Sequence, residues 1–214
     1  MPVLVKALGY YSHKGGKQTK GLSKVKAHLK YLEHGKEHPN EPYGFSQDRE
    51  EMSRAEFLAE VEKQPQRGVI AHKLVISLSQ NERDELGIDM RQLVRATMDD
   101  WSQRLGRHLK WIGFEHQDAG HPHVHVVVAG YAGEKQVGLY ERDLISLRES
   151  TERERGRQAE LERLMPSRNE GRSVDRELER MARELESLHP RAAERAPEKM
   201  PPDRSRDRGW DRGR

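Results

Sequence analysis

A valine-rich run beside a group of histidines limits the possible folds of this chain most. Residues 115–130 read EHQDAGHPHVHVVVAG and hold four of the chain's 11 histidines. The run 124–128 is short, β-branched and bounded by glycine and proline, which predicts a buried strand rather than a helix. Because side chains alternate along a strand, His121, His123 and His125 share one face and the alternate valines face the opposite layer. Two imidazoles on one face can point at a single metal ion or phosphate.

A third imidazole can come from the segment before this strand. Residues 109–116 (LKWIGFEH) form another strand-like run, and a turn at 117–122 would return the chain as its antiparallel partner. His116 would then lie across the hairpin from His123 and His125. Three imidazoles leave coordination positions open, as catalytic metal sites do. Asp118 could accept an imidazole N–H and fix the tautomer of that ring. His121, in its glycine and proline setting, suits a turn or a substrate contact better.

The composition limits the size of the folded domain. Only 33% of the 214 residues are hydrophobic and the mean hydropathy is −1.03, so part of the chain cannot contribute to a core. We expect a domain over residues 1–140, a charged helical extension over 141–189 and a disordered tail over 190–214. The segment 148–158 (RESTERERGRQ) has almost no apolar face and should be solvated or bound by a partner.

Charge and cysteine content narrow the functional classes. The chain has no cysteine, which excludes disulfides and thiolate metal sites and fits a cytoplasmic location. No apolar run approaches ~18 residues and no signal-peptide core is present, so we expect no membrane insertion. The net charge of +3 is too small to indicate nucleic-acid binding by itself. Residues 1–38, however, hold eight lysines against two glutamates, enough to neutralise several backbone phosphates.

The remaining patterns predict an α+β fold, with an antiparallel β-sheet flanked by helices. Apolar residues recur at helical spacing from residue 22 to residue 32, so 23–34 should be a helix that Gly35 ends. Residues 10–21, rich in glycine and lysine, should form a loop. The other elements expected are strands at 2–9, 69–78 and 136–140, the last an edge strand, and helices at 54–61, 90–105 and 142–165.

Tyr31 lies off the apolar stripe of the first predicted helix. It shares its side of that helix with Lys24, His28 and His34, a basic setting for a phenol whose oxygen must become an anion to attack phosphorus. Tyr10 and Tyr11 are alternative nucleophiles because they also lie near the start of the chain. His28 is another, since imidazole can form phosphoramidates.

These motifs resemble those of the relaxase/mobilisation nucleases, which belong to the His-hydrophobic-His (HUH) endonuclease superfamily. The pattern H-x-D followed by P-H-hydrophobic-H, with its aspartate at Asp118, looks like their third motif. Residues 25–37 (VKAHLKYLEHGKE) resemble the first motif, whose tyrosine is Tyr31 here. The strand that ends in Ser77 resembles the second motif, whose serine contacts DNA near the cleaved bond. The superfamily's antiparallel sheet agrees with the fold predicted above.

The resemblance implies site- and strand-specific nicking and rejoining of single-stranded DNA at a plasmid transfer origin. Tyr31 would become linked to a 5′-phosphate, and Asp118 would orient a ligand of a metal held by His116, His123 and His125. That metal would be Mg²⁺ or Mn²⁺ by resemblance, whereas three imidazoles also suit Zn²⁺. Accessory mobilisation proteins and a coupling ATPase would be partners. Contacts to DNA would come from Ser77, Lys24, Lys26 and Lys30, with Tyr43 or Phe45 stacking on a base.

Two other functions fit the same motifs. A rolling-circle replication initiator or transposase of the superfamily shares the chemistry, but it usually has its tyrosine after the histidine pair, where this chain offers Tyr131 and Tyr140. A non-catalytic DNA-binding mobilisation accessory protein could use the histidines structurally. Metal-dependent cleavage of single-stranded DNA separates an enzyme from this second alternative.

Overall fold

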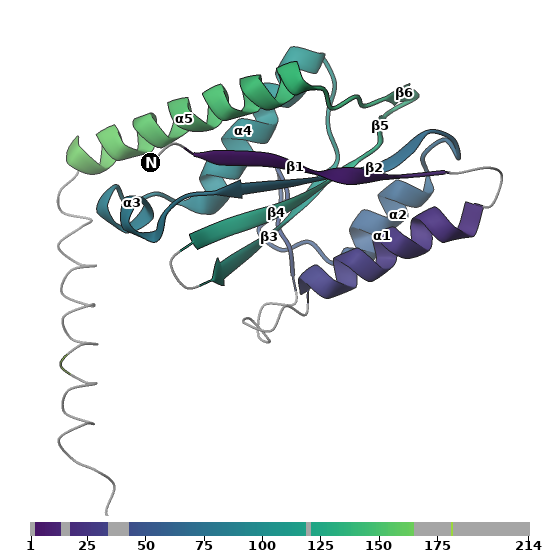
Figure 1. Cartoon of the computed structure of the whole chain (residues 1–214), viewed down its shortest axis with the longest axis horizontal. Helices are drawn as coiled ribbons and strands as arrows, with labels where there is room; N and C mark the ends of the chain where they lie inside the picture. Colours follow the sequence, from purple (N-terminus) through teal and green to yellow (C-terminus); the bar gives the residue numbers. More distant parts are fainter. Residues whose placement is uncertain (1–2, 14–17, 34–42, 119–120, 165–180, 182–214) are drawn as a thin grey trace, which may run out of the picture. The chain divides into compact units, whose positions relative to one another are not determined.

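A computed structural model describes residues 3–13, 18–33, 43–118, 121–164 and 181, without the side chains of residues 18–20 and 117–118. Figure 1 shows the helices and strands in their places. In chain order they are β1 (Leu4–Ser12), α1 (Gln18–Glu33), α2 (Arg54–Glu62), β2 (Val69–Ser77), α3 (Gln80–Glu85), α4 (Met90–Leu105), β3 (Trp111–Asp118), β4 (His121–Ala129), β5 (Tyr131–Ala132), β6 (Lys135–Gln136) and α5 (Glu141–Leu164).

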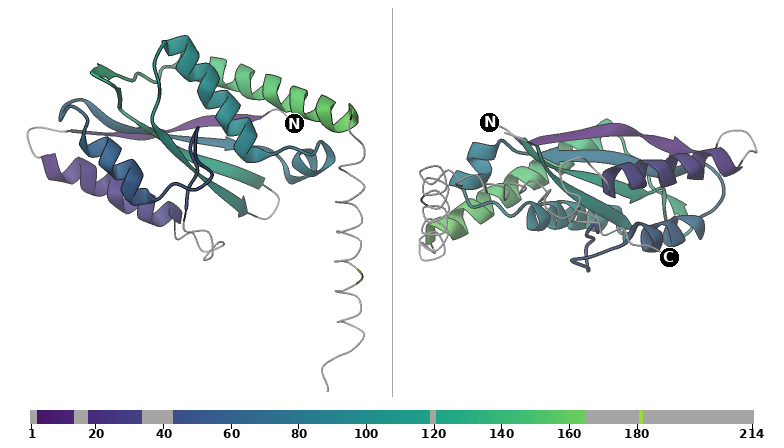
Figure 2. Two further views of the ribbon diagram at one scale, coloured as in Figure 1. Left: turned by 180° about the vertical axis from the view of Figure 1, so that it is seen from behind. Right: turned by 90° about the horizontal axis from the view of Figure 1, so that it is seen from below.

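Four of the strands form one antiparallel sheet in the order β1-β2-β4-β3. Strands β3 and β4 are the predicted hairpin, and β4 lies between β2 and β3. Helices α1 and α2 cover one face of the sheet, and α4 and α5 cover the other (Figure 1), while Figure 2 shows the two helical layers from behind and from below. The predicted α+β class with an antiparallel sheet flanked by helices is confirmed.

Each face of the sheet has its own hydrophobic core. Three side chains of α1, Val25, Leu29 and Leu32, pack with α2 against β3 and β4. On the other face the alternate valines of β4 pack against α4 and α5. Tyr31 belongs to neither core, and 70% of its surface is exposed. The helix therefore docks through its apolar stripe and leaves its tyrosine in solvent.

The first strand is longer than its sequence pattern predicts. Tyr10, Tyr11 and Ser12 belong to β1 and not to a loop, and α1 begins at Gln18, five residues before the predicted start. Ala7 pairs with Leu74, and Gly9, two residues later, pairs with the adjacent Lys73. One residue of β1 is therefore extra, which makes a β-bulge. Gly9 has a φ of 95°, a conformation that glycine adopts without steric cost. After the bulge, β1 continues to pair with β2 as far as Ser12.

The predicted edge strand at 136–140 is wrong. Only Lys135–Gln136 is extended, and it pairs with β5 in a separate two-stranded hairpin. Val137 is buried, and its N–H donates to the carbonyl of Gly130 (2.8 Å), which turns the chain away from the main sheet.

Residues 148–158 of helix α5 pack on the body of the protein through polar side chains, contrary to the expectation of a solvated or partner-bound segment. Thr151 is buried, and its hydroxyl lies 3.1 Å from that of Thr97 on α4. Arg148 donates to the carbonyl of Val5, and Glu152 accepts from the N–H of Val3, so α5 also holds the outer edge of β1. No helix among the described residues is long and apolar enough to cross a membrane.

Replacing Leu29 by alanine should destabilise the protein by roughly 2–5 kcal/mol, because it removes a fully buried side chain from the α1 core. Tyr31→Phe, two residues away, should change the free energy of unfolding by less than about 0.5 kcal/mol, since its hydroxyl is on an exposed side chain. Urea unfolding of both variants measures the difference. Equal losses would mean that α1 does not dock through the stripe described above.

Candidate metal centre

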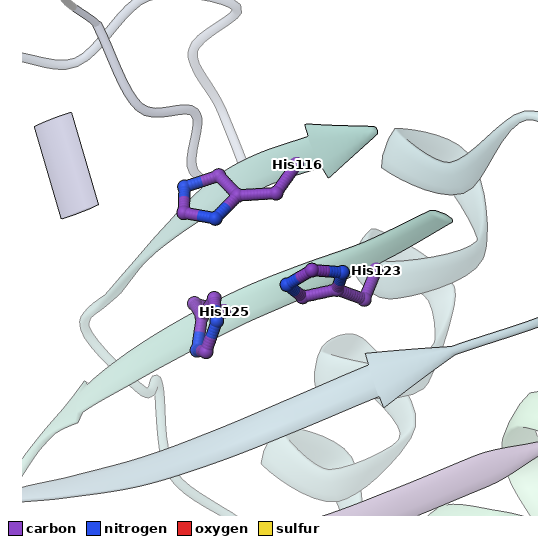
Figure 3. Close-up of side chains that lie close together, drawn as sticks. All are labelled: His116, His123 and His125. Atoms are coloured by element: carbon purple, nitrogen blue, oxygen red, sulfur yellow. The ribbon is translucent and has the colours of Figure 1, made fainter. Parts of the chain in front are cut away.

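Three imidazoles gather on the face of the sheet that α1 partly covers. His116 comes from β3, and His123 and His125 come from β4 (Figure 3). His116 pairs directly with His123 in the strand register. The three ring centroids are 4.9–5.4 Å apart, and one ring nitrogen from each residue lies within 4.8 Å of the others. The convergence predicted for these rings is confirmed.

The donor set of this cluster suits a divalent cation. Metal–imidazole bonds of about 2.0–2.1 Å require ligand nitrogens only a few ångströms apart, and one ring nitrogen of each of these histidines lies within 4.8 Å of the others. The rings are half-buried, which leaves room for a further ligand from solvent or substrate. His121 is exposed and outside the cluster, and it is the first residue of strand β4 rather than part of the expected turn.

The end of α1 reaches the cluster through a backbone carbonyl. Nε2 of His116 lies 3.2 Å from the carbonyl oxygen of Leu32. An imidazole that donates its Nε2 proton there keeps Nδ1 as an acceptor for a cation. Sequence reasoning gave this orienting role to Asp118, whose side chain is outside the described residues and whose backbone pairs with His121. This contact could have been anticipated only from a general rule: the carbonyls in the last turn of a helix lack partners within the helix and so accept hydrogen bonds from other groups.

Tyr31 directly precedes the residue whose carbonyl contacts His116. Its side chain is the exposed phenol in the last turn of α1. The helix that contributes the predicted nucleophile is thus in contact with a member of the histidine cluster. No acidic side chain is in the first turn of the helix, and its last turn carries Lys30.

Ser77 is the neighbour of the cluster on the other side of β4. It pairs with His123 in the β2–β4 register, so Ser77, His123 and His116 form a row across three strands. Its hydroxyl donates to the carbonyl of Pro122 (3.1 Å). The serine predicted from the second motif is therefore at the cluster, as a direct strand neighbour of one of its members.

The alternative nucleophiles are not members of the histidine cluster. Tyr10 pairs with His72, whose side chain faces the α4 side of the sheet. Tyr11 and His28 contact each other on the α1 side, with ring centroids 5.9 Å apart. Burial raises the pKa of the Tyr11 phenol, which disfavours the anion that attack would require. Burial, and then the charge of Lys73, lower the pKa of His28.

The predicted DNA contacts differ in their surroundings. Phe45 is 1% exposed and packs edge-on against Trp111 (5.6 Å between centroids), so the expectation that it stacks on a base is wrong. Tyr43 is exposed. On α1, Lys24 and Lys30 are exposed, whereas the Lys26 ammonium forms an ion pair with Glu62 (2.8 Å). Sequence reasoning did not single out Lys73, a half-buried lysine on the same face as the cluster.

Comparison with known proteins gives one family. No curated protein matches the chain. A family model described as relaxase, MobA/VirD2-like, nuclease domain, matches residues 29–153, which is more than half of the chain and runs from the last part of α1 into α5. The matched region includes Tyr31, Ser77 and the three clustered histidines. This chain therefore belongs to the MobA/VirD2-like relaxase nucleases.

Proposed function

We propose that this protein nicks and rejoins one strand of DNA at a plasmid transfer origin through a covalent link to Tyr31. Membership of the relaxase family supports DNA nicking at transfer origins in general. The observation that carries the specific proposal is the contact between the end of α1 and the histidine cluster, at the carbonyl of Leu32. It joins the element that bears the phenol to the residues that would hold a metal.

His116, His123 and His125 are the residues that would hold a divalent cation. Mg²⁺ or Mn²⁺ agrees with the family, and nitrogen donors favour Mn²⁺ or Zn²⁺ over Mg²⁺. Such an ion, when bound, would neutralise charge on the scissile phosphate. The Leu32 carbonyl would keep the His116 ring oriented, and Asp118 stays a predicted partner for a ligand.

Tyr31 supplies the nucleophile. The phenol gives up its proton to solvent and its oxygen attacks the scissile phosphorus, so a bond forms from Oη to phosphorus. The bond from phosphorus to the 3′-oxygen breaks, and that oxygen leaves and takes up a proton from solvent. One phosphoester replaces another, so the reverse step can rejoin the strand without ATP. The exposure of the phenol allows a DNA strand to approach it.

Binding of the strand relies on charge. Lys24 and Lys30 are exposed near the nucleophile and would contact backbone phosphates, whereas the ion pair of Lys26 with Glu62 reduces its contribution. Ser77 would contact DNA close to the cleaved bond. Accessory mobilisation proteins and a coupling ATPase are the proposed partners for unwinding and transfer.

A later tyrosine, as in rolling-circle initiators and transposases, fits less well. The Tyr131 side chain is buried and its hydroxyl donates to the carbonyl of Arg67 (2.8 Å). Tyr140 is exposed, but it is outside the main sheet and has the guanidinium of Arg142 over its ring. The contact between α1 and His116 favours the N-terminal tyrosine.

Replacing His125 by alanine should weaken Mn²⁺ binding at least tenfold, because it removes one of three nitrogen donors. The control is His121→Ala, which removes an exposed imidazole of the same strand from outside the cluster and should leave the affinity unchanged. Isothermal titration calorimetry with MnCl₂ measures both. Equal effects of the two substitutions would contradict the proposed ligand set.

Single-stranded oligonucleotides that tile the non-coding DNA beside the gene should include one that forms a covalent adduct in the presence of Mn²⁺. Tyr31→Phe should abolish the adduct, because phenylalanine has no oxygen to attack phosphorus. Denaturing gel electrophoresis of labelled DNA detects the adduct, and Tyr11→Phe is the matched control that keeps it. An adduct that persists in Tyr31→Phe and disappears in Tyr11→Phe would move the nucleophile to β1.

A further inference from the structure

The bulge in β1 changes which side chains face the α1 side of the sheet. Before it, Val5 points into the core under α4 and Lys6 is exposed on the other face. The extra residue reverses this alternation, so Tyr11 is on the α1 side, where its ring contacts His28. Without the bulge, the phenol would face the α4 layer. The bulge therefore brings the ring of Tyr11 to the face that also carries His28 and the histidine cluster.

Lys73 of β2 lies between Tyr11 and the metal centre. Val75 pairs with His125, and Lys73 precedes it by two residues, so the two residues point to the same face. Lys73 is thus a diagonal neighbour of His125 in the ladder, with Cα atoms roughly 7–8 Å apart. Its ammonium is 4.9 Å from the centroid of the Tyr11 ring. The two side chains form one unit close to the histidine cluster.

The environment of Lys73 is suited to an anion. The side chain is half-buried, and among the residues that the structure describes no carboxylate lies within ion-pair distance of its ammonium. A partly desolvated cation that has no carboxylate partner among the described residues gains from an anionic ligand. His28, whose ring contacts Tyr11, is the third residue of this group. Burial, and then the charge of Lys73, lower the pKa of His28 and so favour the neutral imidazole, which has one N–H to donate.

The same flank of α1 carries the proposed nucleophile. His28 and Tyr31 are three residues apart and Lys24 is four residues before His28, so the three side chains follow one side of the helix. Beside this flank, Leu4, Lys6 and Leu8 of β1 are exposed and Val75 is half-buried. A strip of sheet surface therefore runs from the histidine cluster past Lys73 to Tyr11, with α1 along one side.

We propose that Lys73, Tyr11 and His28 form a subsite for a second backbone phosphate of the single-stranded DNA, along this strip from the scissile one. Lys73 contacts the phosphate, Tyr11 positions the ammonium through its ring, and His28 donates a hydrogen bond. The identity of the ligand rests on the proposed function. A repeating anion is the partner that fits, because a strand held at the metal centre presents its next phosphates to the neighbouring sheet surface.

Binding of fluorescein-labelled oligothymidine to the full chain in EDTA, followed by fluorescence anisotropy over a series of salt concentrations, tests the subsite. Lys73→Met should weaken binding several-fold and reduce the slope of log affinity against log salt by about 0.7, the value for one lost contact to a single strand. Lys73→Arg should keep the wild-type slope. Lys135→Met, which removes an exposed lysine of β6, should change neither quantity. A wild-type slope in Lys73→Met would overturn the proposal.

The tyrosine variants separate positioning from simple packing. Tyr11→Phe keeps the ring and should bind the oligonucleotide as wild type does, whereas Tyr11→Leu should bind several-fold more weakly. In a Lys73→Met background, Tyr11→Leu should have no further effect, because its contribution acts through the ammonium. An equal loss in both backgrounds would contradict the positioning role. Matching thermal unfolding curves establish that the variants are folded.

The two proposals can fail separately. If no tiled oligonucleotide gives a Tyr31-dependent adduct but Lys73→Met still lowers the salt slope, the nicking function is wrong and the phosphate subsite stands. If the adduct forms and Lys73→Met keeps the wild-type slope, the subsite is wrong and the nicking function stands.

Discussion

Strand β4 contributes to two layers at once, because its side chains alternate between the faces of the sheet. The alternate valines at 124, 126 and 128 are fully buried against α4 and α5, and burial of each contributes roughly 1.5–3 kcal/mol. A shift of the strand register by one residue would turn the imidazoles into that core and the valines toward solvent. The hydrophobic core under α4 therefore fixes the direction in which His123 and His125 point.

Helix α1 joins structure and proposed chemistry through opposite sides of its surface. Its three buried side chains stabilise the docked helix far more than the single contact from Leu32 to His116, since a hydrogen bond contributes only about 1 kcal/mol net. The apolar stripe thus sets the position of Tyr31, and the carbonyl of Leu32 adjusts the His116 ring to it. This division leaves Tyr31 exposed on a helix whose last turn contacts the histidine cluster.

Much of the site could be predicted from the sequence because its signals are local. The spacing of the histidines, the valine run and the short turn predict the β3–β4 hairpin, and the period of Val25, Leu29 and Leu32 predicts α1. The β1 bulge could not be predicted, because one extra residue leaves almost no trace in a pattern of alternating side chains. The burial of Phe45 depends on a bridge to Gly113, far along the chain. Polar packing, as of Thr151 on α4, has no hydrophobic periodicity to detect.

We propose above all that Tyr31 is held beside a cation bound by His116, His123 and His125. Fluorine NMR of protein labelled with 3-fluorotyrosine tests this directly, with Tyr31→Phe used to assign the resonance of that residue. Mn²⁺ is paramagnetic and broadens signals from nuclei close to it. We expect Mn²⁺ to broaden the Tyr31 resonance strongly and the Tyr140 resonance weakly, and His125→Ala to remove the difference. A Tyr31 resonance that stays sharp while Mn²⁺ saturates the three histidines would contradict the account.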